Sequence, residues 1–145
     1  MKFPFFLLAA LAATASLTGE EGSPAVAYFG HDKVAGALAT GGTLMTASDY
    51  KVMGNTRTAN GHPELHEKET DIFYVVDGEA TFVTGGKMLG GKTIAPGQVM
   101  GTEIVGGQVH HLAKGDVIVI PAGVPHWYKE VPHAIAYFAV KVLKP

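Results

Sequence analysis

The sequence contains no cysteine, so the fold has no disulfide bonds and no lipid-modified cysteine can anchor it. Charged residues are also scarce, at 17% of the chain, and the formal net charge is -2. Lysine and arginine form no cluster or stripe of the kind that a polyanion requires. We therefore predict a protein that does not bind nucleic acid and that is stabilised by its hydrophobic core alone.

The apolar run near the N-terminus, residues 3–11, is too short to span a bilayer comfortably. Lys2 precedes this run and the small residues Ala13, Thr14 and Ala15 follow it, which is the layout of a secretory signal peptide. We predict that residues 1–15 are such a peptide, cleaved after Ala15; the alternative is a buried N-terminal helix. The expected product is a secreted or periplasmic protein that is free of the membrane after cleavage.

The remaining length suits one compact domain, and no internal repeat divides it. Residues 16–42 read as a linker and one short helix, in which Asp32 is the N-cap and residues 33–39 form the body. Later segments read as strands: 43–46, 50–56, 72–76, 79–84, 109–112, 117–120, 126–131 and 134–142. The first two are predicted to form a hairpin, and the Asp77-Gly78 pair predicts a second one. This pattern predicts an all-β fold over residues 43–145, a closed barrel or double-sheet jelly roll.

Residues 85–107 stand apart because they contain eight glycines and one proline. Such a segment is long for a simple hairpin loop. It is consistent with an extra hairpin of residues 93–95 and 102–105, with a flap over the barrel mouth, or with a surface excursion that has no role.

Candidate metal ligands occur in two segments that lie far apart in the sequence. His62, Glu64 and His66 alternate, so in an extended strand their side chains share one face, about 7 Å apart. Asp71 follows, and His126 comes after a buried strand and a Pro/Gly turn. If both segments are strands of one barrel, these side chains can meet in its interior, so we predict a metal site there. We predict that the neighbouring Glu67, Lys68 and Glu69 are solvated charges and that His110 and His111 do not bind the metal directly; no role is assigned to His31 or His133.

These two segments resemble the two signature motifs of the cupin superfamily, which are small jelly-roll β-barrels. In the first motif, Glu64-Leu65-His66 stands where the family has a His-x-His pair, Asp71 stands at the acidic position and Gly78 at the closing glycine. The second motif is matched without a gap by Gly115, Pro121, Gly123 and His126, while Glu130 stands where the family often has asparagine.

The resemblance implies one divalent metal ion. A typical cupin site has three histidines and one glutamate, whereas this chain offers Glu64, His66, Asp71 and His126 at the matching positions. His62 is the alternative to Glu64, and it would restore a three-histidine set. The set with Glu64 suits Fe(II), Mn(II) or Zn(II), and its additional carboxylate favours Mn(II) or Fe(II).

Alternation along the strands predicts which other side chains face the interior. From an inward His126, Tyr128 also points inward, where it can act as an acid, a base or a hydrogen-bond donor beside the metal; the alternative is a core tyrosine. The rest of the interior is expected to be apolar and aromatic, with few charged groups beyond the ligands and with Phe73 and Val75 facing inward, which suits a small organic substrate. The residues expected to face outward, and to pack under the N-terminal strands or in a homodimer such as cupins form, are Ile72, Tyr74, Val76 and Trp127.

Two classes of function follow from the resemblance. The first is a metal-dependent enzyme that acts on a small molecule, of the dioxygenase, isomerase or lyase type. The second is a non-catalytic barrel that binds a small molecule, in which the metal is structural or absent. An open coordination position would favour the enzyme.

Overall fold

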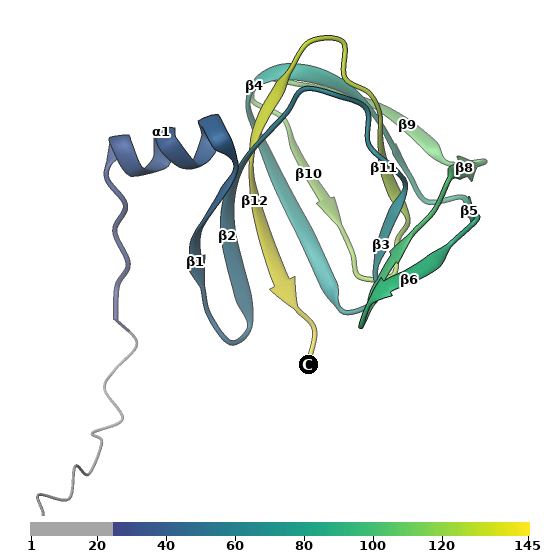
Figure 1. Cartoon of the computed structure of the whole chain (residues 1–145), viewed down its shortest axis with the longest axis horizontal. Helices are drawn as coiled ribbons and strands as arrows, with labels where there is room; N and C mark the ends of the chain where they lie inside the picture. The colour runs from purple at the N-terminus through teal and green to yellow at the C-terminus, as the bar shows by residue number, and fades with distance from the viewer. Residues whose placement is uncertain (1–24) are drawn as a thin grey trace, which may run out of the picture.

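The computed structural model describes residues 25–145, so the predicted signal peptide lies outside the described residues. In this part of the chain, no helix is both long enough and apolar enough to cross a membrane. One helix precedes twelve strands, and their bounds are α1 (His31–Thr40), β1 (Gly42–Thr46), β2 (Tyr50–Arg57), β3 (Glu64–His66), β4 (Glu69–Thr84), β5 (Lys87–Leu89), β6 (Lys92–Ala95), β7 (Gln98–Met100), β8 (Glu103–Val105), β9 (Gln108–Ala113), β10 (Val117–Ile120), β11 (His126–Glu130) and β12 (Ile135–Leu143). The predicted all-β fold with one short helix is confirmed (Figure 1).

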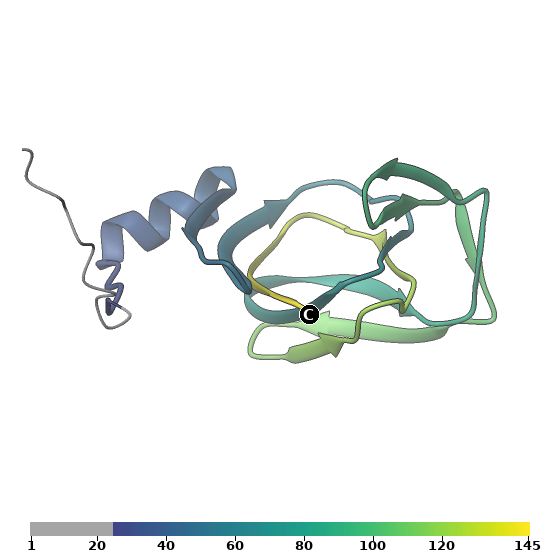
Figure 2. The same cartoon turned by 90° about the horizontal axis from the view of Figure 1, so that it is seen from below.

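Strand β4 is common to both halves of the barrel. Its first half pairs with β12 and β10, and its second half pairs with β11 and β9. The sheet continues from β12 to β2 and β1, and from β11 to β3, β7 and β6. Seen from below, these strands curve round into a barrel (Figure 2).

The predicted hairpin at Asp77-Gly78 is wrong, because β4 runs through both residues without reversing. Gly78 has a φ of +79°, and a Cβ atom there would collide with the Ala134 carbonyl oxygen. The buried positions before Gly78 include Phe73 and Val75, whereas after it they include Ala80 and Phe82. In the pairing with β12, Val75 lies opposite Tyr137 and Asp77 opposite Ala136, so Val76 is skipped. This β-bulge, just before the left-handed Gly78, shifts the inward positions of β4 from odd to even numbers.

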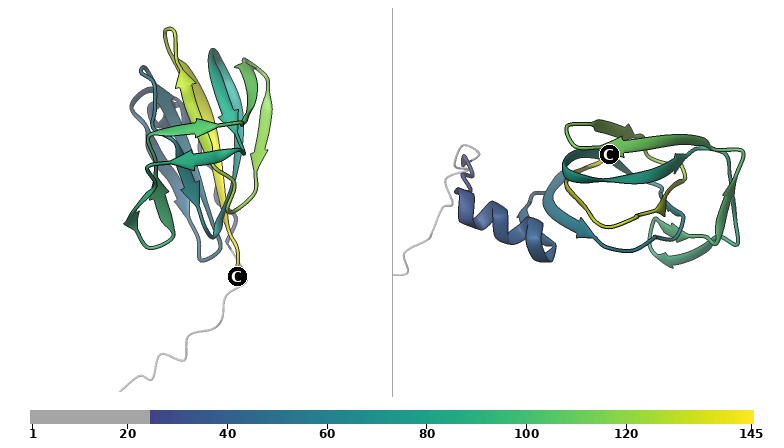
Figure 3. Two further views of the ribbon diagram at one scale, coloured as in Figure 1. Left: turned by 90° about the vertical axis from the view of Figure 1, so that its right-hand side faces the viewer. Right: turned by 90° about the horizontal axis from the view of Figure 1, so that it is seen from above.

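The glycine-rich segment forms four short strands, of which β6 and β7 extend the large sheet and β5 and β8 form a separate two-stranded sheet. Strand β5 pairs with β8 and β6 pairs with β7, so the predicted pairing of residues 93–95 with 102–105 is wrong. The β5–β8 pair runs across the longer strands (Figure 3), and β7 pairs with β3. Two further backbone contacts hold the segment in place: Gly101 N–H donates to Pro63 O at 2.8 Å, and Glu67 N–H donates to Gly97 O at 2.9 Å.

The predicted β1–β2 hairpin is confirmed, and α1 covers the outer face of β2. Gly54 makes this contact possible, because a Cβ atom there would lie 2.8 Å from the Ala37 carbonyl carbon. The predicted cap is wrong: Gly30 is the N-cap, and Asp32 lies in the first turn, where a carboxylate favours the helix dipole.

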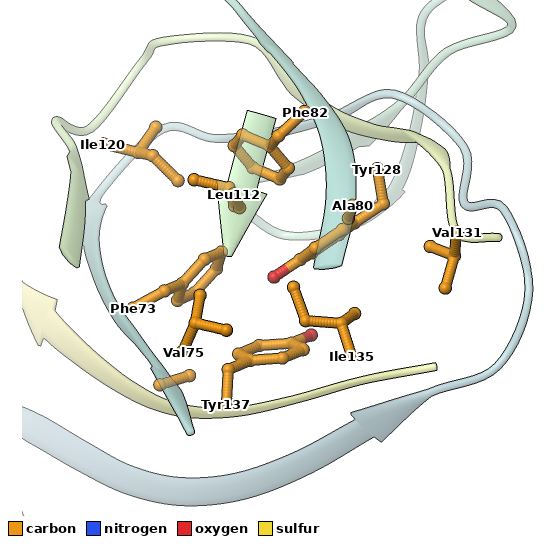
Figure 4. Packing of buried hydrophobic residues seen from close by; sticks show 11 residues of the cluster. Phe73, Val75, Ala80, Phe82, Leu112, Ile120, Tyr128, Val131, Ile135 and Tyr137 are labelled. Carbon is orange, nitrogen blue, oxygen red and sulfur yellow. The ribbon is translucent and has the colours of Figure 1, made fainter. Parts of the chain in front are cut away.

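The barrel core is a cluster of apolar and aromatic side chains (Figure 4). As predicted, Phe73, Val75 and Tyr128 face inward and are buried. The Tyr128 ring lies edge-on to Phe82 with centroids 4.6 Å apart, and its centroid is 5.3 Å from that of Tyr137. Aromatic side chains thus pack at the end of the barrel next to His126, whose ring centroid is 6.0 Å from that of Phe82.

We predict that Gly78→Ala lowers the free energy of unfolding by about 3 kcal/mol or more, because left-handed strain and overpacking add. The matched control is Gly85→Ala: Gly85 has a φ of +70° but no neighbouring atom within 4 Å of its added Cβ, so about 1 kcal/mol is expected. Urea unfolding of both variants measures the difference. Equal losses would show that close packing at Gly78 does not matter.

Candidate metal centre

Three strands bring the predicted ligands together. Glu64 and His66 alternate on β3, which lies between β7 and β11, and Glu64 is the register partner of His126 on β11. Asp71 enters from β4 and is almost fully buried, with 1% of its surface exposed. His66 and His126 are also buried, and their ring centroids lie 5.1 Å apart.

The distances between these side chains fit a shared ion. Asp71 Oδ2 lies 3.4 Å from His66 Nε2 and 3.6 Å from His126 Nε2, and His66 Nε2 lies 3.8 Å from Glu64 Oε2. Ligands about 2.1 Å from one ion, at tetrahedral or octahedral angles, are separated by about 3.0–3.4 Å. The observed separations are slightly longer, so small side-chain movements would complete the coordination.

The hydrogen bonding of His126 directs a lone pair at this centre. Its Nδ1 lies 3.1 Å from the Val124 carbonyl oxygen, which can only accept, so Nδ1 carries the hydrogen and Nε2 is free to bind an ion. Burial lowers the pKa of His126 and keeps the ring neutral near pH 7. Asp71 Oδ2 is buried and has no hydrogen-bond partner among the described residues. Two electron-rich atoms therefore face each other, an arrangement that a cation stabilises.

His66 behaves differently from His126. Burial by itself lowers the pKa of His66, but the Asp71 carboxylate opposes this effect and prevails, so the pKa lies above its ordinary value. Without an ion, a proton on His66 therefore compensates part of the Asp71 charge. A metal ion would displace that proton, because a ligating imidazole must be neutral.

Lys141 is a member of the centre that the sequence analysis missed. Its Nζ atom lies 2.8 Å from Asp71 Oδ1, opposite the atom that faces the histidines. Burial tends to raise the pKa of Asp71, but His66 and Lys141 lower it by more than burial raises it. The pKa of Asp71 therefore lies below its ordinary value, and the group is ionised. Lys141 is the only charged residue of β12 and has the same parity as the buried Tyr137 and Ala139, so alternation could have placed it inside.

Residues 43–145 match the cupin family. The chain is a cupin. No curated protein matches its sequence. The predicted superfamily and the cupin jelly-roll fold are thus confirmed.

Solved structures share this fold at low sequence identity. A Bacillus halodurans protein is 13% identical with a TM-score of 0.52, and the match covers 71% of this chain and 69% of that protein. A Klebsiella pneumoniae protein with a double-stranded β-helix domain is 17% identical, with a TM-score of 0.49 and coverage of 70% and 69%. A cupin protein from Bacteroides fragilis is 13% identical, with a TM-score of 0.48 and coverage of 67% and 68%. At this identity, the likeness to the Bacillus halodurans protein supports the fold and nothing further.

Glu69 lies next to the metal centre. The prediction that it is a solvated charge is wrong. Only 13% of its side chain is exposed, and its Oε2 accepts from Gln98 Nε2 at 3.2 Å and lies 3.4 Å from Lys141 Nζ. The same atom is 4.0 Å from His66 Nδ1. Gln98 belongs to the glycine-rich segment, so that segment contributes directly to the surroundings of the centre.

Two compact groups of potential ligands occur among the described residues. Glu64, His66 and His126 form one, and His66, Glu69 and Asp71 form the other, with ligand atoms within 4.8 Å of one another. His62 belongs to neither group, although it lines the adjoining cavity. His110, which we did not predict as a ligand, instead lies 2.8 Å from Thr84 Oγ1 through its Nε2. The choice of Glu64 over His62 stays a prediction that this geometry favours.

A cavity of about 170 Å³ reaches the centre from the aromatic end of the barrel. Glu64, Asp71 and His126 line it, so a molecule in the cavity can approach an ion held there. As expected, few charged groups other than the candidate ligands line the cavity; they are Arg57 and Lys141. Trp127, which we predicted on the outer face, lines the cavity too, and its Nε1–H donates to Gly61 O at 2.8 Å.

The hydroxyl group of Tyr128 is buried without a hydrogen-bond partner among the described residues. Burial, and then the neighbouring Tyr137, raise the pKa of Tyr128 far above its ordinary value. Ionisation is therefore disfavoured, which argues against a role as a base but leaves the hydroxyl available as a hydrogen-bond donor. Its catalytic role stays a prediction.

We predict that the chelator-treated protein loses stability as the pH falls from 6 to 5. In this range the unfolded chain protonates His126 near its ordinary pKa of 6.5, whereas the folded protein resists protonation, so the unfolded state binds more protons. His66 is largely protonated in both states at these pH values, and Asp71, whose folded pKa lies below 3.8, is largely ionised in both. The slope is at most about 1.4 kcal/mol per pH unit.

In His126→Gln, the free energy of unfolding should change less with pH between 6 and 5 than in the wild type. The control is His133→Gln, which changes an exposed histidine and should leave the wild-type pH dependence unaltered. Urea unfolding at several pH values measures the slopes. An equal slope in the wild type and in His126→Gln would contradict the neutral state inferred for His126.

Proposed function

We propose that this cupin binds one divalent metal ion through Glu64, His66, Asp71 and His126 and acts on a small organic molecule. The observation that carries the proposal is the buried pair of His126 Nε2 and Asp71 Oδ2, two electron-rich atoms 3.6 Å apart. A bound ion would polarise a substrate oxygen or bind dioxygen, which fits dioxygenase, isomerase or lyase chemistry.

The donor set guides the identity of the ion. Two imidazoles with one or two carboxylates suit Fe(II), Mn(II) or Zn(II), and the carboxylates favour Mn(II) or Fe(II). The cavity that adjoins Glu64, Asp71 and His126 supports an open coordination position, as a catalytic site requires.

The protein's own groups supply orientation and charge. Lys141 holds Asp71 Oδ1 and leaves Oδ2 directed at the imidazoles, while the Val124 carbonyl fixes the tautomer of His126. Tyr128 is proposed to act as a neutral hydrogen-bond donor to the substrate, because burial opposes its ionisation.

The alternative is a non-catalytic barrel that binds a small molecule, with a structural metal or none. One observation favours it: the Lys141 ammonium group, 2.8 Å from Asp71, places a positive charge beside the centre and weakens its attraction for a cation. Metal content separates a metal-free barrel from the first proposal.

We expect elemental analysis of protein purified without chelator to find about one transition-metal ion per chain. His126→Asn should abolish this content and Glu64→Gln should reduce it strongly, because each removes a proposed ligand. His133→Asn is the control, since His133 is exposed and lies outside both ligand groups. If His126→Asn retains the full content, the centre is not the metal site; if His62→Asn loses metal while Glu64→Gln keeps it, His62 is the ligand.

We further propose that the protein is exported, to the periplasm or beyond, after cleavage at Ala15. Lys2, the apolar run of residues 3–11 and the small residues 13–15 support this proposal.

The proposed mature form is a homodimer. Val117 and Val119 on β10 are 61% and 55% exposed, and they lie opposite Tyr74 and Ile72 on the outer face of β4. In the described chain β10 pairs with β4 alone, so its other edge is open. An open edge with an apolar face is a surface that a second copy can cover, by extending the sheet across a two-fold axis.

One preparation tests export and assembly together. The full chain, produced in a Gram-negative host and purified from the periplasm, should have an intact mass that begins at Ser16 and should sediment as a dimer. Val117→Lys/Val119→Lys should shift the sedimentation to a monomer, whereas Val109→Lys, at an exposed position on β9, should not. An uncleaved mass would contradict export, and a wild-type monomer would contradict the dimer.

A further inference from the structure

We propose that Arg57 binds a carboxylate group of the substrate, and that the substrate of this cupin is therefore a small organic acid. This inference rests on the proposed function, because it concerns the molecule that occupies the cavity next to the metal centre. It makes Arg57 a residue that determines specificity.

Arg57 is the only arginine of the sequence, and it lies at the end of β2. On this strand, Met53, Asn55 and Arg57 alternate, and all three line the cavity that also contains His126 and Asp71. Arg57 and the metal centre thus belong to one cavity.

The charge of Arg57 has no counterpart among the described residues. It forms no salt bridge with the acidic side chains of this part of the chain, and its buried Nε has no hydrogen-bond partner. The guanidinium carbon lies 5.0 Å from the centroid of the Tyr128 ring, a cation–π contact that positions the group but satisfies none of its N–H donors. Buried polar groups are normally paired, so this donor calls for an acceptor from outside the chain.

The remaining charges of the cavity favour an anion. Lys141 is neutralised by Asp71, and Glu64 is committed to the metal in the proposed function. With a divalent ion in place, the cavity has an excess of positive charge, and the Arg57 charge contributes to it. Electrostatic attraction therefore selects against neutral and cationic molecules.

The geometry of the donors selects a carboxylate. A guanidinium group donates two parallel hydrogen bonds to a carboxylate, which fixes its orientation. The unpartnered Tyr128 hydroxyl and the side chain of Asn55 line the same cavity and can serve a hydroxyl or carbonyl group of the same molecule. A volume of about 170 Å³ limits that molecule to a few carbon atoms.

The experiment uses the fact that a single arginine gives a single Nε–H signal in a ¹⁵N NMR spectrum. The mature chain, in chelator-treated and Zn(II)-loaded forms, is titrated with acetate, lactate, pyruvate and succinate, and with acetamide and lactamide as neutral partners. We expect at least one acid to shift the Nε–H signal saturably in the Zn(II)-loaded form, and its amide to bind at least tenfold more weakly.

Arg57→Lys retains the charge but not the paired donors, so binding of that acid, followed by backbone amide shifts, should weaken at least tenfold. Lys87→Met is the control: Lys87 is an exposed cation on β5 that lines neither of the two cavities next to the metal centre, and its loss should change binding less than twofold. The same spectra show that each variant is folded.

The outcomes separate the two proposals. If no acid moves the Arg57 signal in either form, or if the amides bind as well as the acids, or if Arg57→Lys binds as the wild type does, the carboxylate site is wrong. If the acid binds through Arg57 with and without added Zn(II) but Zn(II) does not bind to the centre, the metal proposal fails and the carboxylate site stands.

Discussion

The site depends on one buried charge, the carboxylate of Asp71. With 1% of its surface exposed, this group has lost its hydration and must be compensated by the protein. Lys141 compensates one oxygen at 2.8 Å, and the other oxygen faces the Nε2 atoms of His66 and His126. Lys141 compensates the charge of Asp71 even when no metal ion is bound. The two imidazoles on the other side leave room for a metal ion to bind Asp71 as well.

An irregularity in the central strand contributes to this arrangement, because a β-bulge at Val76 directly precedes the left-handed Gly78. Before Gly78, β4 pairs with β12, which carries Lys141; after Gly78, it pairs with β11, which carries His126. A straight strand or a hairpin at this position would not bring both partners to the same interior. The left-handed conformation of Gly78 is therefore a condition for the site as well as for the fold.

The glycine-rich segment, residues 85–107, also contacts the strand and the side chains that surround the metal centre. Strand β7 pairs with β3, and Gln98 on β7 is the register partner of His66. Through its hydrogen bond to Glu69, Gln98 also holds a carboxylate next to Lys141. The glycine-rich segment thus lies directly beside the metal centre. Its glycines permit the tight turns between its four short strands.

The sequence by itself determined the family, the all-β fold and the positions of Glu64, His66, Asp71 and His126, because motif spacing and strand alternation are local properties. Alternation also predicted the inward Phe73 and Tyr128. Only the tertiary structure showed the Asp71–Lys141 pair, the burial of Glu69 and the isolated charge of Arg57. Which strands become neighbours, and which charges then lose their water, depends on pairings between residues as far apart as Tyr50 and Val142, which are 92 positions from each other. No local pattern encodes those pairings, so the electrostatic partners of the site emerged only with the closed barrel.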